Sequence, residues 1–582
     1  MRTRTFIIWF LALAAFVAYG RVMMRDVGYV YEEIFPHQRL LPDTLERVPM
    51  SDGWQLSHQD YKDPVEGCRT VLATQWPTFA VQCGAQVWPI LSETYQGQWA
   101  YYLSLAWQAA FGNSLGSIRT LSGIIFALGL LLFFFVVRRE SGKTTAVVSV
   151  VLLGTTTIYM SSSAFGFLYE CVPMLLAVAA YGFWSRGQVG RPRRTLFIAG
   201  AAFCLSAAIS LKATVGILVV PFGYLLWAQR DKLSGLKSGW GLVLGAALLP
   251  MVPFAAHELI AISMDSHSSI LYTLSARGDL LGDASRLPSI ILDSLFWLLA
   301  FGGNINSTSR PVFGVESLPW LRMDLVLLFV AACVWSTRRW ARGEATMLER
   351  VSLIACVAAY WESVLLYATD TEIQTFLYVV PFLVTLNGRF YVWLASRMAQ
   401  RFKEGGRARK ETVVLAALVG LYAVQPAEVL LDSISPPHLM SSAAAERAIC
   451  DGLDADDQVV TTNYNHIGAI EHCSDNRIRP VHAYFLLSPG STGQQLQADL
   501  RFGVEYLLDR WPAHTYLFDA APATVWEARE GSVLAGEEAL TGLRLELFKA
   551  EVVRRGGTIT TPVKGRNRRG ETVLILLRVE WE

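Results

Sequence analysis

Two adjacent carboxylates, Glu32 and Glu33, stand less than ten residues beyond an apolar run at Phe6–Met24. A carboxylate at the edge of a bilayer can accept the proton of an acceptor hydroxyl while a lipid-linked substrate is held in the membrane. The same segment also carries several acidic residues that solvation alone explains: Asp43, Glu46, Asp52, Asp60, Asp63 and Glu66. Glu32 and Glu33 are therefore candidates for a general base, with a solvated acidic pair as the alternative.

Three charged residues lie within or beside long apolar runs: Glu170, Lys212 and Glu362. A charge near the centre of a bilayer costs about 2.5–3.5 kcal/mol on insertion scales, so such residues are candidates for function. Lys212 is expected at an outside turn, where it could contact the phosphate of a lipid donor or extend its ammonium group to the membrane surface. Glu170 could pair with Lys212 or position a substrate.

Other motifs offer little chemistry. His257, Asp265 and His267 are weak candidates for a divalent cation site, but their spacing is loose and a polar surface is the favoured interpretation. Lys143 follows a glycine as in a phosphate-binding loop, yet Val137 stands where that loop needs its first glycine. No cofactor is therefore certain, although a divalent cation is possible. The net charge of +1 and the lack of a basic aromatic patch argue against a nucleic-acid partner.

Apolar runs long enough to cross a bilayer recur along the first three quarters of the chain. Charged residues make up only 17% of the sequence, whereas soluble proteins carry about a quarter. A run of about 20 apolar residues spans the hydrocarbon layer as a helix, and no cleavage site follows the first run. We predict about eleven spanning helices, at 6–24, 118–137, 144–162, 164–184, 195–211, 213–229, 239–262, 320–337, 351–368, 373–395 and 412–431.

Basic residues between these runs set the predicted orientation, because short loops rich in Lys and Arg remain on the cytoplasmic side. The basic loops lie near residues 138–143, 186–194, 230–237, 338–342 and 397–410. All of them can be inside only if the N-terminus is cytoplasmic and the C-terminus is outside. The apolar stretch 288–302 is then not a span, and we expect a re-entrant or surface helix there.

The cysteines agree with this topology. Four of the eight, Cys171, Cys204, Cys333 and Cys356, fall inside apolar runs, where a small buried side chain is sufficient explanation. The other four form two local pairs, Cys68 with Cys83 and Cys450 with Cys473, in segments predicted to face an oxidising compartment. Two disulfides are plausible there, with unrelated thiols as the alternative.

The predicted organisation is a transmembrane module at 1–431, which includes an outside loop at 25–98, followed by a soluble α/β domain at 432–582. Runs at 458–462 and 505–508 are typical of short strands, and 493–502 of a helix. Strands that alternate with helices favour a small α/β sheet.

Several short motifs follow one another along residues 1–400. They are Glu32–Glu33 after the first span, 95–102 and Phe111–Arg119 before the second, 161–184, 207–221 and Tyr378–Pro381. Their order resembles that of the GT-C superfamily, membrane glycosyltransferases that use polyprenyl-phosphate sugars and include the protein O-mannosyltransferases and the lipid A aminoarabinose transferases. In that superfamily an Asp-Glu pair follows the first helix, and Glu32–Glu33 falls on it. The late span usually opens with an Arg-Tyr pair, whereas this chain has Glu372-Ile-Gln374.

The resemblance implies a GT-C-like polytopic α-helical membrane protein that transfers a sugar from a polyprenyl-phosphate donor with inversion. The transfer to a hydroxyl of a lipid, glycan or protein acceptor would occur at the outer face of a bacterial inner membrane. Glu32 or Glu33 would act as the base, and Lys212, Glu170, Arg119 and Gln374 would bind the donor phosphate or substrate. The alternatives are a lipid-linked glycan flippase without catalysis and a structural assembly protein.

Overall fold

The structure is a computed structural model. It describes residues 11–18, 46–49, 55–59, 65–73, 78–84, 86–93, 96–97, 99–112, 114–164, 168–187, 193–233, 236, 239–263, 287–302, 323–366, 377–401, 407–434, 443–454, 457–461, 466, 469–470, 478, 480–486, 493–512, 514–519, 545–560, 563–566, 570 and 572–581. The chain divides into a helical unit, Met1–Met23, Ile90–Gly112 and Gly116–Pro437, and an α/β unit, Met24–Pro89, Asn113–Leu115 and His438–Glu582. The division thus places Met24–Pro89 with the C-terminal residues, whereas the sequence grouped 25–98 with the spans.

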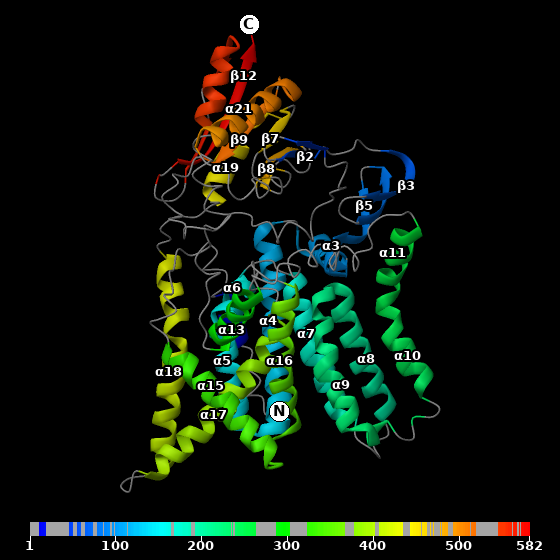
Figure 1. The fold of residues 1–582 in the computed structure, drawn as a ribbon, viewed down its shortest axis with the longest axis vertical. Helices are drawn as coiled ribbons and strands as arrows, with labels where there is room; N and C mark the ends of the chain where they lie inside the picture. Colours follow the sequence, from blue (N-terminus) through cyan, green and yellow to red (C-terminus); the bar gives the residue numbers. More distant parts are fainter. Residues whose placement is uncertain are drawn as a thin grey trace. The chain divides into compact units, whose positions relative to one another are not determined.

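The helical unit follows the apolar runs of the sequence (Figure 1). Its helices are α3 Trp99–Phe111, α4 Leu115–Ser141, α5 Lys143–Gly154, α6 Thr157–Ala164, α7 Leu168–Arg186, α8 Arg194–Leu211, α9 Val219–Ala228, α10 Trp240–Leu248, α11 Val252–Ser263, α13 Leu287–Gly302, α15 Met323–Ala341, α16 Met347–Leu366, α17 Val380–Arg401 and α18 Arg407–Ile434. The predicted run 144–162 is split between α5 and α6. Short 3₁₀ segments, η2 Ala213–Leu218, η3 Arg230–Lys232 and η4 Leu249–Met251, follow α8, α9 and α10.

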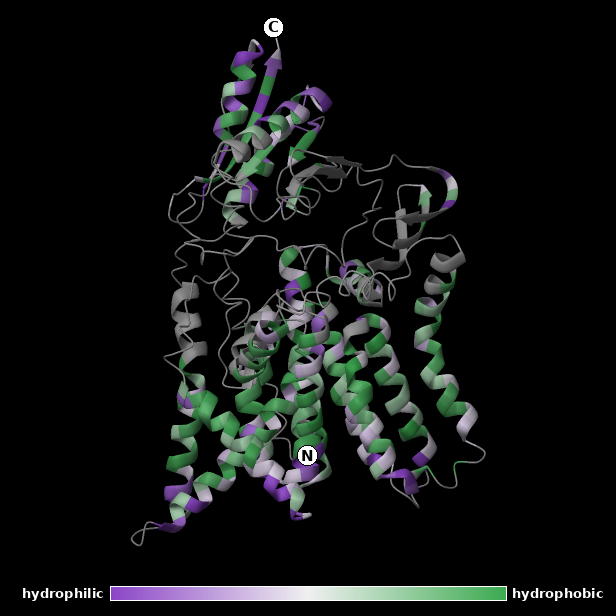
Figure 2. Ribbon diagram, in the orientation of Figure 1, coloured by the Kyte–Doolittle hydropathy of each residue, from purple (hydrophilic) through white to green (hydrophobic). Residues whose placement is uncertain are grey.

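Two of the described helices, Leu115–Ser141 and Arg194–Leu211, are by themselves long and apolar enough to cross a membrane. Hydrophobic residues dominate most of the other helices of this unit too (Figure 2). The predicted total of about eleven spans therefore stays a prediction. Of the first predicted span, the structure describes 11–18, which are helical.

The helix α13 occupies the stretch predicted to be re-entrant or to lie on the surface. It packs against α15, α16 and α17, and Ile290 on α13 is buried together with Val364 on α16. Its 16 residues give a length of about 24 Å at 1.5 Å per residue. The structure thus shows α13 as a member of the helix bundle.

The helix α17 lies at the centre of one group, since it packs against α5, α15, α16 and α18. Its close approach to α5 depends on Gly388. A Cβ atom at this position would lie 3.2 Å from the Cα atom of Ser149, so a larger residue would force the two helices apart.

The α/β unit is built on a sheet with the strand order β1-β2-β8-β7-β9-β12-β10, and β11 also pairs with β12. The strands are β1 Glu46–Pro49, β2 Gln55–Gln59, β7 Val459–Thr461, β8 Val481–Leu486, β9 Thr515–Asp519, β10 Gly557–Ile559, β11 Val563–Arg566 and β12 Thr572–Trp581. The strand β7 runs parallel to β8 and β9. The hairpin β1–β2 comes from the predicted first outside loop, and β2 pairs with β8 in an antiparallel register from Gln55↔Leu486 to Gln59↔His482.

Apolar side chains cover both faces of this sheet. Successive residues of β9 alternate between the two: Tyr516 and Phe518 pack in a core with α21 (Gly493–Arg510) and the helix at 545–554, while Leu517 packs in a core with α19 (Ala443–Asp451). This is the two-residue period of a strand that is buried on both faces. The strand predicted at 505–508 is wrong, because these residues belong to α21. Val504, Leu507 and Leu508 are spaced to lie on one buried face of that helix.

A second sheet, β3 Val65–Ala73, β4 Thr78–Gly84, β5 Gln86–Glu93 and β6 Gln96–Gly97, is an antiparallel array in chain order. Cys68 and Cys83 are opposite each other on β3 and β4 and form a disulfide, as predicted. Cys450 is also disulfide-bonded, but its predicted partner Cys473 lies outside the described residues. Peptide mapping without reduction would test the Cys450–Cys473 link.

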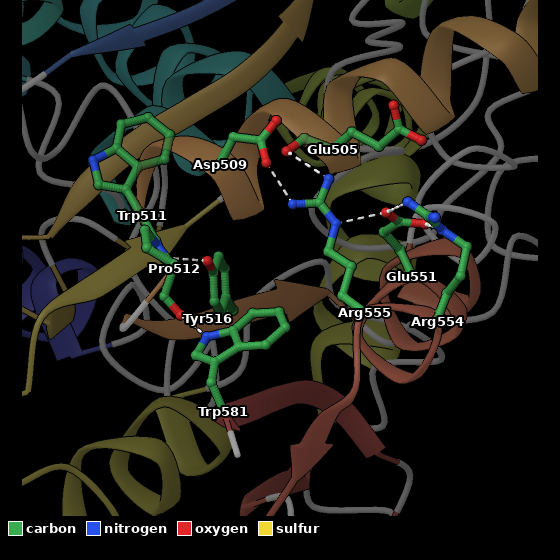
Figure 3. A network of polar contacts seen from close by, with 9 residues as sticks. All are labelled: Glu505, Asp509, Trp511, Pro512, Tyr516, Glu551, Arg554, Arg555 and Trp581. Atoms are coloured by element: carbon green, nitrogen blue, oxygen red, sulfur yellow. Dashed lines mark hydrogen bonds and ion pairs between the residues drawn. The ribbon is translucent and has the colours of Figure 1, made fainter.

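An ion-pair network at the end of the helix 545–554 reaches α21 through Arg555, the residue that follows this helix (Figure 3). The guanidinium of Arg555 donates to Glu551 at 2.7 Å and to Asp509 on α21 at 2.5 Å. Arg554 donates to the same Glu551 carboxylate at 2.6 Å. These bonds, led by the one from Arg554, lower the pKa of Glu551 to about 2, while partial burial opposes the shift.

The pKa of Glu551 predicts an acid-sensitive contribution to stability. A carboxyl group whose pKa is lowered on folding stabilises the fold at any pH above its unfolded pKa, which is about 4.5 for a glutamate. This stabilisation is lost as the pH falls towards the folded pKa of about 2. We expect Glu551→Gln to lower the unfolding temperature of the α/β unit near neutral pH and to flatten its decline below about pH 4.5. Calorimetry of the full chain measures both. Glu546→Gln, which removes an exposed pair with Lys549, is the control; equal effects of the two variants would contradict this prediction.

Candidate active site in the helical unit

The first component of the site is a buried ion pair. Glu170 lies in the first turn of α7, and Lys212 lies at the junction of α8 and η2. The Nζ atom of Lys212 donates a hydrogen bond to Oε1 of Glu170, and the two residues are 1% and 7% exposed. Of the alternatives left open by the sequence, the structure thus shows Glu170 paired with Lys212, and it does not show Lys212 extending its ammonium to a surface.

The backbone around Lys212 explains how a lysine reaches the interior. Helix α8 ends at Leu211, Lys212 is extended with φ −148° and ψ 108°, and the chain continues as the 3₁₀ helix η2. The carbonyl of Lys212 accepts a hydrogen bond from the amide of Val215 at 3.0 Å. A 3₁₀ turn is a common connector at helix ends, and here η2 leads from the extended Lys212 into α9.

A buried ion pair is weak evidence for a role in stability. Removing two charges from water costs several kcal/mol for each ion, and their attraction often only offsets this cost. Apolar side chains of similar size would fill the same space without that penalty. The pair between Glu170 and Lys212 therefore stays a candidate for a functional role.

A second carboxylate lies within electrostatic reach of Lys212. Glu362 on α16 is 1% exposed, and its Oε2 atom accepts a hydrogen bond of 2.5 Å from the hydroxyl of Tyr378, in the turn before α17. The positive charge of Lys212 acts on Glu362 as well, and α16 packs against η2. Glu170, Lys212, Glu362 and Tyr378, here called the buried polar cluster, therefore combine residues from four parts of the helical unit.

Two further polar groups lie on α4. Arg119 is buried near the N-terminal end of this helix. Ser122, one turn later, is buried as well and donates to the Sγ atom of Cys171, the residue that follows Glu170, at 3.8 Å. The contact between Ser122 and Cys171 joins α4 to the first turn of α7, which carries Glu170.

Several predicted site residues lie outside the described residues: Glu32, Glu33, Gln374, Asp265 and His267. His257 belongs to α11, but its side chain is likewise not described. Within the described part of the chain, no group of three or more His, Cys, Asp or Glu residues could hold a metal ion. The proposed roles of all these residues stay predictions.

A different buried carboxylate, that of Glu349 on α16, forms contacts that hold helices together. It pairs with Arg389 on α17 at 3.1 Å and with Arg339 on α15 at 3.3 Å. Its Oε2 atom also accepts from the amide of Thr346 at 2.7 Å, while the Thr346 hydroxyl accepts from the amide of Glu349 at 3.3 Å. This reciprocal pair is a capping box, for which the sequence Thr346-Met-Leu-Glu349 is the signal. Glu349 therefore fastens three helices together.

Comparisons with known proteins agree with the fold. The family model for dolichyl-phosphate-mannose-protein mannosyltransferase matches residues 98–257, which include Arg119, Glu170 and Lys212. The crystal structure of ArnT from Cupriavidus metallidurans bound to undecaprenyl phosphate is similar with a TM-score of 0.52 and 10% identity, over 99% of this chain and 98% of that chain. The structure of AglB from Archaeoglobus fulgidus, in complex with an inhibitory peptide and a dolichol-phosphate, has a TM-score of 0.46 and 12% identity. The match covers 88% of this chain and 69% of that chain. No curated protein sequence matches the chain.

The fold is thus similar to that of ArnT, and the predicted resemblance to the GT-C superfamily is confirmed. Over residues 98–257 the chain resembles the mannosyltransferases of the matching family model. Two described helices are long and apolar enough to cross a membrane, which agrees with the membrane protein that this fold implies.

Proposed function

We propose that the chain is an inverting glycosyltransferase that moves a sugar from a polyprenyl-phosphate donor to a hydroxyl group at the outer face of the membrane. The observation that carries this proposal is the buried pair of Glu170 and Lys212, inside the segment that resembles mannosyltransferases. The bound undecaprenyl phosphate of the similar ArnT structure supports a donor of this class.

In this reaction Lys212 holds the donor phosphate and Glu170 orients the ammonium. The acceptor oxygen attacks the anomeric carbon, the bond from that carbon to the phosphate oxygen breaks, and Glu32 or Glu33 takes the proton of the acceptor. The polyprenyl phosphate leaves with the bonding electron pair, and Lys212 stabilises the charge that gathers on it. One displacement inverts the anomeric carbon. The energy of the donor's own phosphoester bond makes ATP unnecessary.

Further parts of this proposal concern the surroundings of the site. Arg119 and Gln374 are additional candidates for donor binding, and the acceptor is a lipid, a glycan or a protein.

The chain would lie in a bacterial inner membrane with its N-terminus in the cytoplasm and its α/β unit outside. Reporter fusions after Arg342 and at Glu582 should then show opposite sides, and the same side for both would refute this topology.

Transfer by the purified full chain, supplied with a panel of radiolabelled polyprenyl-phosphate sugars, tests the function. The Glu32→Gln/Glu33→Gln variant should keep its fold and lose transfer, because neither amide can accept the proton. A flippase would need no base there. If wild type and variant translocate the labelled lipid equally and neither transfers the sugar, the enzyme hypothesis is rejected and the chain is a transporter.

A further inference from the structure

The buried polar cluster, as far as the structure describes it, contains two carboxylates and one ammonium group. Lys212 is in hydrogen-bond contact with Glu170 and acts electrostatically on Glu362. The Tyr378 hydroxyl supplies a hydrogen bond to Glu362 but no charge. With both carboxylates ionised, the ammonium of Lys212 would interact with two negative charges in the interior of the helical unit.

The donor phosphate would make this imbalance larger. It is an anion, and Lys212 would have to share its ammonium among the phosphate, Glu170 and Glu362. Charges that are removed from water interact strongly, because little solvent screens them. An ionised Glu362 would therefore repel the phosphate and compete with it for Lys212, whereas a protonated Glu362 would do neither.

We propose that Glu362 is a positioning residue for Lys212 whose protonation is linked to donor binding, so that the phosphate binds when the Glu362 carboxyl carries its proton. This inference rests on the proposed function, because it takes Lys212 as the group that contacts the phosphate. Tyr378 holds the carboxyl in place by its hydrogen bond to Oε2. The Oε1 atom of Glu362 has no hydrogen-bond partner among the described residues, so it is the position at which the proton would reside.

Few ionisable groups act on Glu362 in the part of the chain that the structure describes. They are the Tyr378 hydroxyl and the Lys212 ammonium, and Glu170 acts through Lys212. The helices α9, α13, α15 and α17 also pack on α16, but no described contact joins an ionisable side chain of theirs to Glu362. A pH effect that disappears with Glu362 is therefore assigned to this carboxyl group.

The affinity for undecaprenyl phosphate, measured between about pH 6 and about pH 9 on the full chain in detergent, tests the inference. If binding of one lipid requires the uptake of one proton by Glu362, the affinity should fall as the pH rises beyond the point where Glu362 ionises. The fall is at most about tenfold for each pH unit. Glu362→Gln has nearly the same shape and is neutral at every pH. We expect Glu362→Gln to bind the lipid at least as tightly as wild type at low pH. At high pH its affinity should exceed that of wild type by about tenfold or more.

Two variants separate the possible failures. Tyr378→Phe removes the hydrogen bond but keeps the carboxyl, so its affinity should still fall with rising pH. Lys212→Gln should bind undecaprenyl phosphate more weakly at every pH; if it retains wild-type affinity, the phosphate role of the proposed function fails. The inference about Glu362 alone is overturned if Lys212→Gln binds more weakly while Glu362→Gln follows the wild-type pH curve. It is also overturned if Glu362→Gln binds more weakly throughout despite a wild-type unfolding temperature.

Discussion

Lys212→Gln should lower the rate of sugar transfer by about one to two orders of magnitude at equal concentrations of folded protein. The variant lacks one charge-assisted contact to the donor phosphate, and such contacts contribute about 1.5–3 kcal/mol. Each 1.36 kcal/mol is about a factor of ten in rate. The loss should be divided between donor affinity and the rate of transfer, because the phosphate gains charge as the sugar departs. Transfer rate and donor affinity are measured together.

Two other variants give this experiment its controls. Lys143→Gln makes the same chemical change at an exposed position at the start of α5, and it should transfer at the wild-type rate. Lys212→Arg keeps the charge and should retain part of the activity, although the larger guanidinium fits the site less well. Wild-type transfer by Lys212→Gln would remove the phosphate role and leave Glu32 and Glu33 as the remaining candidates for catalysis.

Glu349→Gln should destabilise the helical unit by about 3 kcal/mol while leaving the chemistry of donor binding unchanged. Breaking a buried ion pair by neutralising one partner costs about 3–5 kcal/mol, because the other charge remains uncompensated. Here two guanidinium groups, those of Arg339 and Arg389, would remain. The low end of the range is expected, because the side chains of both arginines are partly exposed, at 23% and 14%. Unfolding of the full chain in detergent gives the loss of stability.

Glu344 provides a matched control on the same arginine. Its carboxylate lies 3.7 Å from Arg339 and its side chain is 53% exposed, so Glu344→Gln should change the stability little. If the two variants lose similar stability, Glu349 does not fasten α15, α16 and α17. If Glu349→Gln instead loses affinity for undecaprenyl phosphate at a retained fold, Glu349 belongs to the binding site.

The sequence predicted the parts of this molecule that depend on local patterns. Apolar runs located most helices of the helical unit, and the predicted outside location of Cys68 and Cys83 indicated the disulfide between β3 and β4. Glu170 and Lys212 were singled out because charges in apolar runs are costly, and this reasoning needs no knowledge of the fold. The break between α5 and α6 follows Gly154, at Thr155–Thr156, and it was missed because the apolar run 144–162 continues across it.

Most other contacts between distant segments could not be predicted in this way. Glu362 was visible as a charge in an apolar run, but no sequence pattern tells which lysine or tyrosine will face it. Tyr378 was noticed for its position before Pro381, not for its hydroxyl. Similarly, β2 has no local signal that selects β8 as its partner, because the register of two distant strands depends on the whole sheet.

The pairing of β2 with β8 also has a consequence in time. About four hundred residues separate the two strands, and the apolar helices lie between them. At a synthesis rate of about 5–20 residues per second, the ribosome needs tens of seconds to proceed from one strand to the other. During that interval β2 has no β8 to pair with, and an unpaired strand is a site for wrong association. We therefore expect this sheet to be completed only after the intervening helices have been synthesised, so that a chain released early would expose the β1–β2 hairpin to proteases.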